Sequence, residues 1–426
     1  MNYALKNMIL LNGHEDMAPI AGKAILVEGE TIAAIVDENA IPSGYPVFDL
    51  GGSYLLPGLI NLHAHLPSGG APSKKKMDYA KLAKLLRLAV VRKVIAAMCA
   101  GNARKALFSG VTTVRCVGGV LHLDTELRNR INAGKTVGPR ILAADYAVSV
   151  PGGHMTGSVA LPAHSAEEAA QMVRDLLPAN PDLIKLMITG GVLDAEKLGE
   201  PGVLKMPPEY VRAAVEEAHK NGKKVAAHVE GTEGMTVALQ NGVDTVEHGG
   251  KPTGEVLDLF QKTGSVLVAT LSPAIPFAEF TENVMNLSDF DIYNGKSLFA
   301  YMQECIIACL ERGIPVGLGT DAGCPYITHY DFWRELTYFV HYCHVTPAFA
   351  IHMATEINAS IAGLSEITGT VDPGKCADFL IVDKNPLDDL TALKNPAMVI
   401  ARGRIFDHPK VKRIPAVEEQ MNKIQF

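Results

Sequence analysis

The chain has 426 residues, of which 48% are apolar, and a net charge of −7, so we expect a large buried core and more than one ordinary domain. The acidic balance argues against nucleic acid or an anionic membrane surface as the main partner. The first residues lack the pattern of a signal peptide, and no apolar run approaches the roughly 18 residues of a membrane span. Seven scattered cysteines form no Cys-x-x-Cys pair, so we expect reduced thiols and a cytoplasmic location.

Both ends of the chain show the alternation of apolar and polar residues that is typical of β-strands. KAILVEGETIAAIV (23–36) alternates around a Gly-Glu turn and predicts a hairpin. GKCADFLIVDKNP (374–386) and AMVIARGRIF (397–406) predict further strands near the other end. The two ends could pair into one small sheet module, although patterning alone leaves this open.

Between the ends, short apolar runs alternate with longer helical stretches. One such stretch, 207–222, starts with proline, carries apolar residues on one face and stops at Asn-Gly. The predicted strands are 59–66, 112–118, 140–149, 183–190, 224–230, 244–249, 265–272 and 315–321. Eight strand–helix units predict an α/β protein with a (β/α)8 barrel.

Six polar residues lie near the ends of predicted strands, where metal ligands are expected in a barrel. They are His63, His65, Lys185, His228, His248 and Asp321. His63 and His65 are two positions apart in a strand, so both can point into the barrel mouth. One such histidine is more often structural than functional. The ordered set, on strands whose carboxyl ends converge on one face, predicts a divalent-cation site.

These segments resemble the signature motifs of the amidohydrolase superfamily of metal-dependent hydrolases. The matching segments are LLPGLINLHAHL (55–66), AAHVEG (226–231), VEHGG (246–250), GLGTDAG (317–323) and GTVDPGKCADFLIVDKNPLDDL (369–390). The resemblance covers nearly the whole chain. It implies a TIM-like barrel over residues 57–367 and one discontinuous β-sandwich domain made of residues 1–56 and 368–426.

Lys185 indicates which branch of the superfamily the chain resembles. An ammonium cannot ligate a metal, but a desolvated lysine near two cations has a depressed pKa, and its free amine can take up carbon dioxide. The matching lysine of the binuclear branch is carboxylated in this way. The resemblance therefore implies two divalent ions, with zinc expected and manganese, cobalt or iron open. One ion would take His63, His65 and Asp321, and the other His228 and His248, bridged by the carbamate and a hydroxide. A one-metal site with Lys185 merely nearby is the alternative.

The implied reaction is hydrolysis of an amide-type carbon–nitrogen bond in a small molecule by metal-activated hydroxide. Asp321 would pass the proton to the leaving nitrogen, and His154 in VPGGHMTG (150–157) would hydrogen-bond the developing oxyanion. His329 is a candidate pocket residue. The chain resembles most the Xaa-Pro and Xaa-Arg dipeptidases and the imidazolonepropionase-like proteins. We therefore expect a dipeptide, an N-acyl amino acid or a related amide as substrate, and a homo-oligomer.

Several alternatives stay open. They are a hydrolase of cyclic amides or imidazolones, a deaminase and a non-catalytic scaffold. Superfamily deaminases carry His-x-x-Glu on the fifth strand, where this chain has Gly231, and a scaffold should have gaps among the six positions. Glu230 stands where some peptidase-like members have a tyrosine that contacts a substrate carboxylate. A glutamate there fits a cationic or N–H-bearing group better, or it orients a metal ligand.

Overall fold

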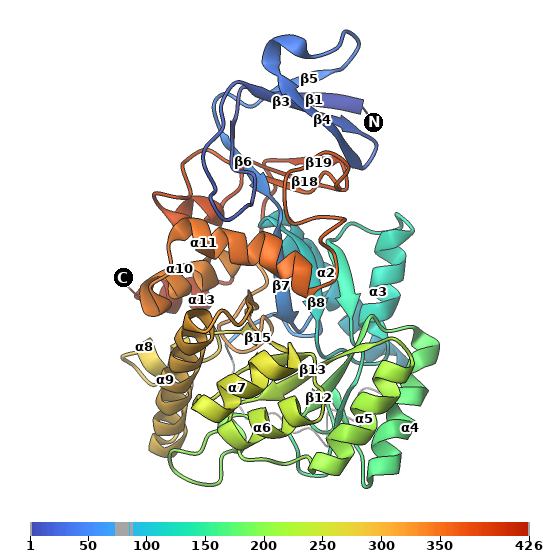
Figure 1. Ribbon diagram of the computed structural model, residues 1–426, viewed down its shortest axis with the longest axis vertical. Helices are drawn as coiled ribbons and strands as arrows, with labels where there is room; N and C mark the ends of the chain where they lie inside the picture. The colour runs from blue at the N-terminus through green and yellow to red at the C-terminus, as the bar shows by residue number, and fades with distance from the viewer. Residues whose placement is uncertain (1, 73–84, 86–87, 425–426) are drawn as a thin grey trace.

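The computed structural model describes residues 2–72, 85 and 88–424 of the chain (Figure 1). Two small sheets form one end of the molecule, and a barrel with its surrounding helices forms the larger part. Within the described residues, none of the helices combines the length and the apolar character that a bilayer span requires.

The barrel contains the eight predicted strands, and all neighbouring strands in it pair in parallel. In chain order the strands of this part are β7 (Leu59–Ala64), β8 (Val111–Cys116), β9 (Arg140–Ala143), β10 (Ala147–Ser149), β11 (Ala160–Pro162), β12 (Leu183–Met187), β13 (Lys224–Val229), β14 (Thr245–His248), β15 (Val266–Ala269) and β16 (Val316–Leu318). A parallel bridge between Ala64 and Ala322 connects the β7 side to the segment after β16. The predicted TIM-like barrel is confirmed.

One predicted strand differs from the structure. The run 140–149 is not continuous, because it forms β9 and β10 with a turn between them. Asp145 in that turn has a φ of 65°, a left-handed conformation that interrupts an extended strand. The break leaves β10 to pair with both β11 and β12.

Helices surround the barrel, and α5 and α6 contact β13 on the face shown in Figure 1. The α-helices are α2 (Ala89–Phe108), α3 (Leu123–Asn132), α4 (Ala166–Leu176), α5 (Pro208–Lys220), α6 (Thr232–Gln240), α7 (Gly254–Thr263), α8 (Ile275–Glu279), α9 (Asp289–Glu311), α10 (Phe332–Cys343), α11 (Pro347–His352), α12 (Asn358–Ile361) and α13 (Pro415–Met421). Shorter helical turns are η1 (Glu38–Ala40), η2 (Leu177–Ala179), η3 (Val192–Asp194), η4 (Met353–Ile357) and η5 (Leu390–Lys394). Helix α5 matches the stretch predicted at 207–222, and its four apolar positions from Val211 to Ala218 are buried.

The two small sheets combine strands from both ends of the chain. One has the order β4-β3-β1-β5 and the other β19-β18-β17-β6-β2. Their strands are β1 (Asn2–Lys6), β2 (Ile9–Leu10), β3 (Lys23–Glu28), β4 (Thr31–Asp37), β5 (Val47–Asp49), β6 (Tyr54–Pro57), β17 (Phe379–Val382), β18 (Met398–Ala401) and β19 (Arg404–Asp407). Strand β17 pairs antiparallel with β6, with Phe379 opposite Pro57.

A separate apolar core lies between these sheets. It joins N-terminal residues such as Tyr3 and Ile25 to C-terminal residues such as Phe379 and Ile400, each of them fully buried. Burial of apolar surface from both ends against each other stabilises their pairing. The patterning had left that pairing open, whereas the exact boundaries at residues 56 and 368 stay a prediction.

Candidate metal centre

The six predicted metal ligands come from five strand ends at one mouth of the barrel. His63 lies near the end of β7 and His65 just beyond it, Lys185 lies in β12, His228 in β13, His248 ends β14, and Asp321 follows β16. Parallel strands of a barrel end at the same face, so residues far apart in sequence meet there. His248 and Asp321 have φ values of 71° and 55°, a strained conformation that is frequent at functional sites.

Three of the six form a compact group. One ligand atom each from His63, His65 and Asp321 lies within 4.8 Å of the others. The Asp321 Oδ1 atom is 3.0 Å from Nε2 of His65 and 3.6 Å from Nε2 of His63. Burial would raise the pKa of Asp321, but its hydrogen bond with His65 and the nearby imidazoles hold that pKa well below its usual range. Asp321 is therefore available as an anionic ligand.

The rings of His248 and His228 lie next to this group at the barrel mouth. The ring centroids of His63 and His248 are 4.6 Å apart, and those of His248 and His228 are 4.7 Å apart. Burial lowers the pKa of His63 to about 4 and lowers the pKa of His228 and of His248 well below 6.5. Neutral imidazoles are the form that binds a metal ion.

The Nδ1 atoms of His63, His65 and His248 have hydrogen-bond partners within the protein, as the second ring nitrogen of a metal-ligating histidine usually does. Nδ1 of His63 is 2.7 Å from Glu247 Oε2, and Nδ1 of His248 is 2.7 Å from Thr270 Oγ1. Nδ1 of His65 is 3.2 Å from the carbonyl oxygen of Gly118. Each of these three rings thus directs Nε2 towards the shared space, which fits a metal site.

A buried ion pair between Arg115 and Glu247 holds the ring of His63 in place. Arg115 donates to both carboxylate oxygens of Glu247, at 2.7 and 2.8 Å, while His63 donates to the same carboxylate. Burial would raise the pKa of Glu247, but Arg115 and the hydrogen bond from His63 hold it far below its usual range. The sequence reasoning missed both Arg115 and Glu247. Their signal was a charged residue inside an otherwise apolar strand, which has to find a partner when buried.

Lys185 lies in the interior of the same mouth. Its side chain is 1% exposed, and within the described residues its Nζ atom has no hydrogen-bond partner. Burial lowers the pKa of Lys185 to about 8, with a further lowering by the positive charge of Arg115 that the Glu247 carboxylate opposes. Lys185 is therefore mostly protonated at neutral pH, and the free amine becomes the major form above about pH 8.

His154 contacts His228, one of the predicted metal ligands. The two rings stack with centroids 4.2 Å apart and planes 6° apart. Nδ1 of His154 donates to Asp194 at 2.6 Å, and although burial raises the pKa of Asp194, this hydrogen bond and the charge of His154 lower it overall. Asp194 was missed by the sequence reasoning, because its partner is 40 positions away in the chain.

His329 is buried in the segment between β16 and α10. Its Nε2 atom donates to the carbonyl oxygen of Ser68 at 2.7 Å, and burial lowers the pKa of His329 to about 4. The ring is thus a neutral group held by the backbone after β7. A contact between His329 and substrate stays a prediction.

Glu230 is 8% exposed and lies two residues after His228. Its Oε1 atom is 4.0 Å from Nε2 of His228, and within the described residues its Oε2 atom has no hydrogen-bond partner. Burial first, and then the charges of Asp321 and Asp194, raise the pKa of Glu230 well above its usual range. Among the described residues, no lysine or arginine forms an ion pair with this carboxyl group.

Gly319, at the end of β16, is packed against His63 so closely that no side chain fits. A Cβ atom there would lie 2.4 Å from the His63 Cβ atom and 2.8 Å from its backbone nitrogen. We expect Gly319→Ala to push His63 aside, to lower the free energy of unfolding by about 1–3 kcal/mol as overpacking does, and to weaken metal binding. Urea unfolding and metal titration measure both effects. Gly254→Ala, where a Cβ meets nothing within 4 Å, is the matched control. Wild-type metal affinity in Gly319→Ala would contradict this account of the site.

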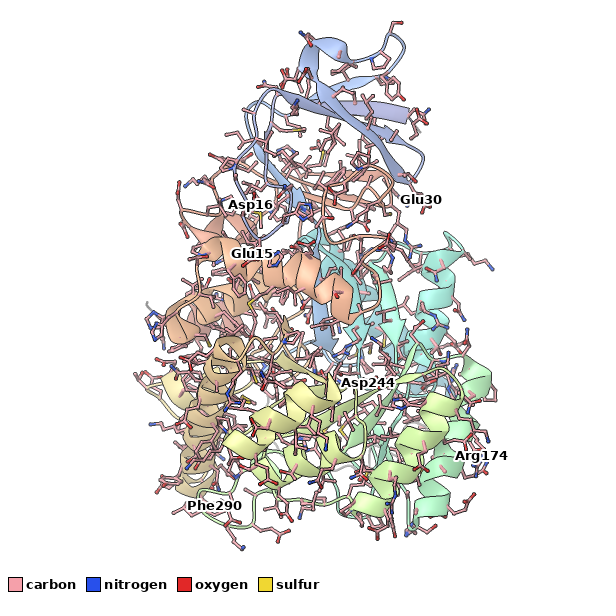
Figure 2. All side chains as sticks on the ribbon, in the orientation of Figure 1. Glu15, Asp16, Glu30, Arg174, Asp244 and Phe290 are labelled. Atoms are coloured by element: carbon pink, nitrogen blue, oxygen red, sulfur yellow. The ribbon has the colours of Figure 1, made fainter. Side chains whose placement is uncertain are left out.

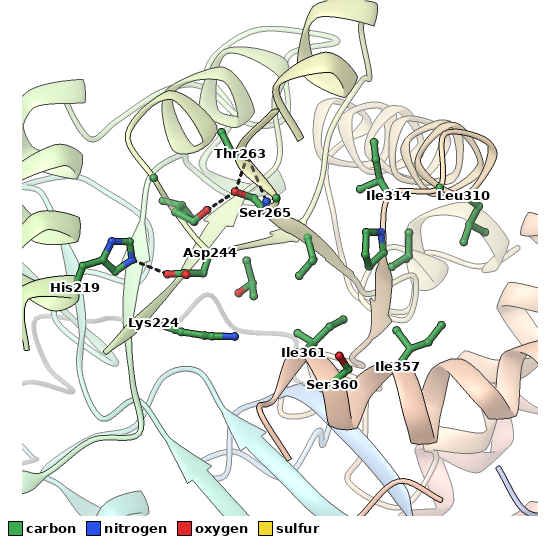
Figure 3. A pocket seen from close by; sticks show the side chains of 18 of the residues that line it. His219, Lys224, Asp244, Thr263, Ser265, Leu310, Ile314, Ile357, Ser360 and Ile361 are labelled. Atoms are coloured by element: carbon green, nitrogen blue, oxygen red, sulfur yellow. Dashed lines mark hydrogen bonds and ion pairs between the residues drawn. The ribbon is translucent and has the colours of Figure 1, made fainter. Parts of the chain in front are cut away.

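A different hollow, of about 920 Å³, lies at the opposite end of the barrel strands (Figure 3). It is lined at its polar edge by His219, Lys224 and Asp244, and Asp244 is also labelled in Figure 2. The Asp244 carboxylate accepts hydrogen bonds from His219 at 2.8 Å and from the backbone nitrogen of Val225 at 2.7 Å. The Asp244 carboxylate already has hydrogen-bond partners within the protein. We therefore take the group of His63, His65 and Asp321, and not this hollow, as the candidate site.

Comparisons with known proteins agree with this geometry. Residues 54–406 match the family model described as Amidohydrolase family. The chain is 27% identical to the ochratoxinase of Aspergillus niger over 93% of this chain and 85% of that protein. It is 25% identical to the imidazolonepropionase of Rhodococcus jostii, over 87% of this chain and 84% of that protein.

Solved structures are similar over almost the full length. A putative prolidase from Bifidobacterium longum has a TM-score of 0.87 at 33% identity, covering 99% of this chain and 98% of that one. A Xaa-Pro dipeptidase with methionine bound in its active site has a TM-score of 0.82 at 28% identity, covering 96% of this chain and 100% of that one.

Proposed function

The chain belongs to the amidohydrolase family, whose members typically bind a metal centre. From this premise we propose that it cleaves an amide-type bond of a dipeptide, an N-acyl amino acid or a related small amide. It is a hydrolase that acts on carbon–nitrogen bonds, and its substrate is a small molecule. The observation that carries the proposal is the group of His63, His65 and Asp321, which offer ligand atoms within 4.8 Å of one another. Lys185 is buried at the same barrel mouth, and its Nζ atom has no hydrogen-bond partner in the part of the chain that the structure describes.

We infer two divalent ions, with zinc as the expected metal. His63, His65 and Asp321 would hold one, and His228 and His248 the other, with Lys185 between them as a carbamate formed from carbon dioxide. The lowered pKa of Lys185 supports this assignment, because a carbamate forms only from the unprotonated group. When bound, such ions lower the pKa of water and polarise the substrate carbonyl.

The protein's own groups then supply the proton transfers and the hydrogen bonds. Asp321 is an anionic base at the mouth that accepts the proton of the attacking water and delivers it to the leaving nitrogen. His154 is held by Asp194 with its ring against His228, so its Nε2 can donate a hydrogen bond to the carbonyl oxygen as negative charge develops there. His329 would line the pocket beside His65.

A cyclic amide is the second candidate substrate, favoured by the similarity to imidazolonepropionase and to the enamidase of Eubacterium barkeri, which is 25% identical over 88% of this chain. A deaminase is disfavoured because Gly231 occupies the position of its acid. We also propose a cytoplasmic homo-oligomer. The seven free cysteines support the compartment, and the exposed apolar side chains of Val90, Val94 and Met98 on α2 support self-association.

The test is a measurement of metal content together with a panel of amide substrates. We expect two equivalents of zinc per chain, loss of hydrolysis after chelation, and recovery when zinc is restored. The panel contains dipeptides, N-acyl amino acids and cyclic imides, scored by release of amino acid and, separately, of ammonia. Hydrolysis that is unaffected by complete metal removal, or ammonia as the product, would contradict the proposal.

A further inference from the structure

The Glu230 carboxyl group is buried in the site, and among the described residues no lysine or arginine side chain forms an ion pair with it. Its side chain is 10% exposed, and Oε2 has no hydrogen-bond partner within the described part of the chain. The nearest acids, Asp194 and Asp321, already have partners in His154 and His65. A buried carboxyl oxygen that lacks a partner is costly, and a cation that arrives from outside would both pair with it and favour its ionised form.

Orientation of a metal ligand does not account for this side chain. The Oε1 atom is 4.0 Å from Nε2 of His228, which is too long for a hydrogen bond. The carbonyl oxygen of Gly190 is nearer to the same nitrogen, at 3.4 Å. Among the described residues, His228 is the only ion-pair contact of Glu230. The backbone of Val192 also hydrogen-bonds the carboxyl group. The geometry therefore leaves Oε2, which has no partner among the described residues, for another group.

We propose that Glu230 binds a protonated amino group of the substrate and so makes the enzyme selective for amides that carry one close to the scissile bond. This inference rests on the proposed amide hydrolysis. An ammonium that approaches Oε2 would form a charge-assisted hydrogen bond in a site from which water is largely excluded. A substrate carboxylate in the same place would be repelled by Glu230 and by its acidic neighbours.

Glu230 and His228 are only 4.0 Å apart, and this closeness limits where the amino group of the substrate can be. Because His228 is a proposed metal ligand, the scissile carbonyl must lie close to its ring. The cationic nitrogen is therefore only a few bonds from the carbonyl carbon, and not at the end of a long side chain. Two positions satisfy this: an α-amino group on the acyl side, or an amino group on the leaving side.

The experiment compares matched amides with the zinc-loaded full-length protein. On the acyl side the pair is glycine anilide and glycolic acid anilide, and on the leaving side it is N-acetylethylenediamine and N-acetylethanolamine. In each pair an ammonium is replaced by a neutral hydroxyl. We expect kcat/KM for the amine to exceed that of its hydroxyl partner by about 10- to 100-fold on one of the two sides, the range for a hydrogen bond to a charged group.

The variant Glu230→Gln is expected to reduce this ratio to nearly one while keeping two equivalents of zinc. Glu233→Gln, an exposed acid on α6, is the control and should keep the wild-type ratio. A wild-type ratio near one on both sides, or an equal loss for both members of a pair in Glu230→Gln, overturns the inference. Absence of any amide cleavage contradicts the proposed function instead. Calorimetric binding of the same pairs then still decides whether Glu230 selects the amine.

Discussion

Replacing Asp321 with asparagine is expected to lower kcat by about 10²- to 10⁴-fold, the usual contribution of a positioned general base. Asparagine keeps the shape of the side chain and one oxygen for a metal, but it cannot accept and deliver a proton. The low pKa of Asp321, which the hydrogen bond from His65 maintains against the effect of burial, keeps it ionised as a base. Steady-state kinetics and metal analysis by mass spectrometry measure the two effects.

The catalytic loss should exceed the loss of metal. Asp258→Asn is a matched control, because Asp258 lies on α7 and pairs there with Arg312, with its side chain 70% exposed. We expect wild-type kcat and metal content from that variant. If Asp321→Asn loses activity only in proportion to its loss of metal, Asp321 is a ligand and not the proton carrier.

Replacing Lys185 with alanine is expected to reduce bound zinc from two equivalents to one or fewer and to lower activity by about 10- to 100-fold, the usual cost of a defect around a metal site. In the wild type, metal loading in the presence of bicarbonate should become faster as the pH rises through about 8. The sign follows from the lowered pKa: below about 8 the amine is protonated and unreactive, and above it the free amine takes up carbon dioxide.

Carbon-13 bicarbonate and nuclear magnetic resonance detect the carbamate directly, and we expect one labelled carbamate signal in the wild type. The exposed Lys262→Ala on α7 should keep both this signal and two equivalents of zinc. Two bound ions in Lys185→Ala, or a fully active wild-type enzyme without a carbamate signal, would favour the one-metal alternative.

The barrel could be read from the sequence because its signals are local. Each strand is a short apolar run, and each helix, such as α5, has its own start and stop residues. The error at 140–149 has a local physical cause, since Asp145 adopts a left-handed conformation that apolar patterning does not reveal. The pairing of β6 with β17 joins residues more than 300 positions apart, and patterning alone could not establish it.

The candidate site, like the fold, has features that the sequence reveals and features that it does not. Histidines at strand ends are visible in the sequence because strand ends of a barrel share one face. The partners that hold them are not visible. Glu247 is recognisable as a charge in a buried strand, but only the folded barrel shows that it lies between Arg115 and His63. Asp194 is likewise identified as the partner of His154 only by their contact.

The sequence by itself indicated the class of the protein: strand periodicity predicted a (β/α)8 barrel, and the motifs at the strand ends resemble those of the amidohydrolase family. Residue type and strand periodicity are local properties, and they carry that information. The tertiary structure decided which of these groups are paired and which are left without a partner. Among the described residues, Lys185 Nζ and Glu230 Oε2 are buried atoms at the barrel mouth without a hydrogen-bond partner. Pairing depends on distances between segments that are far apart in the chain, because burial removes water as the alternative partner.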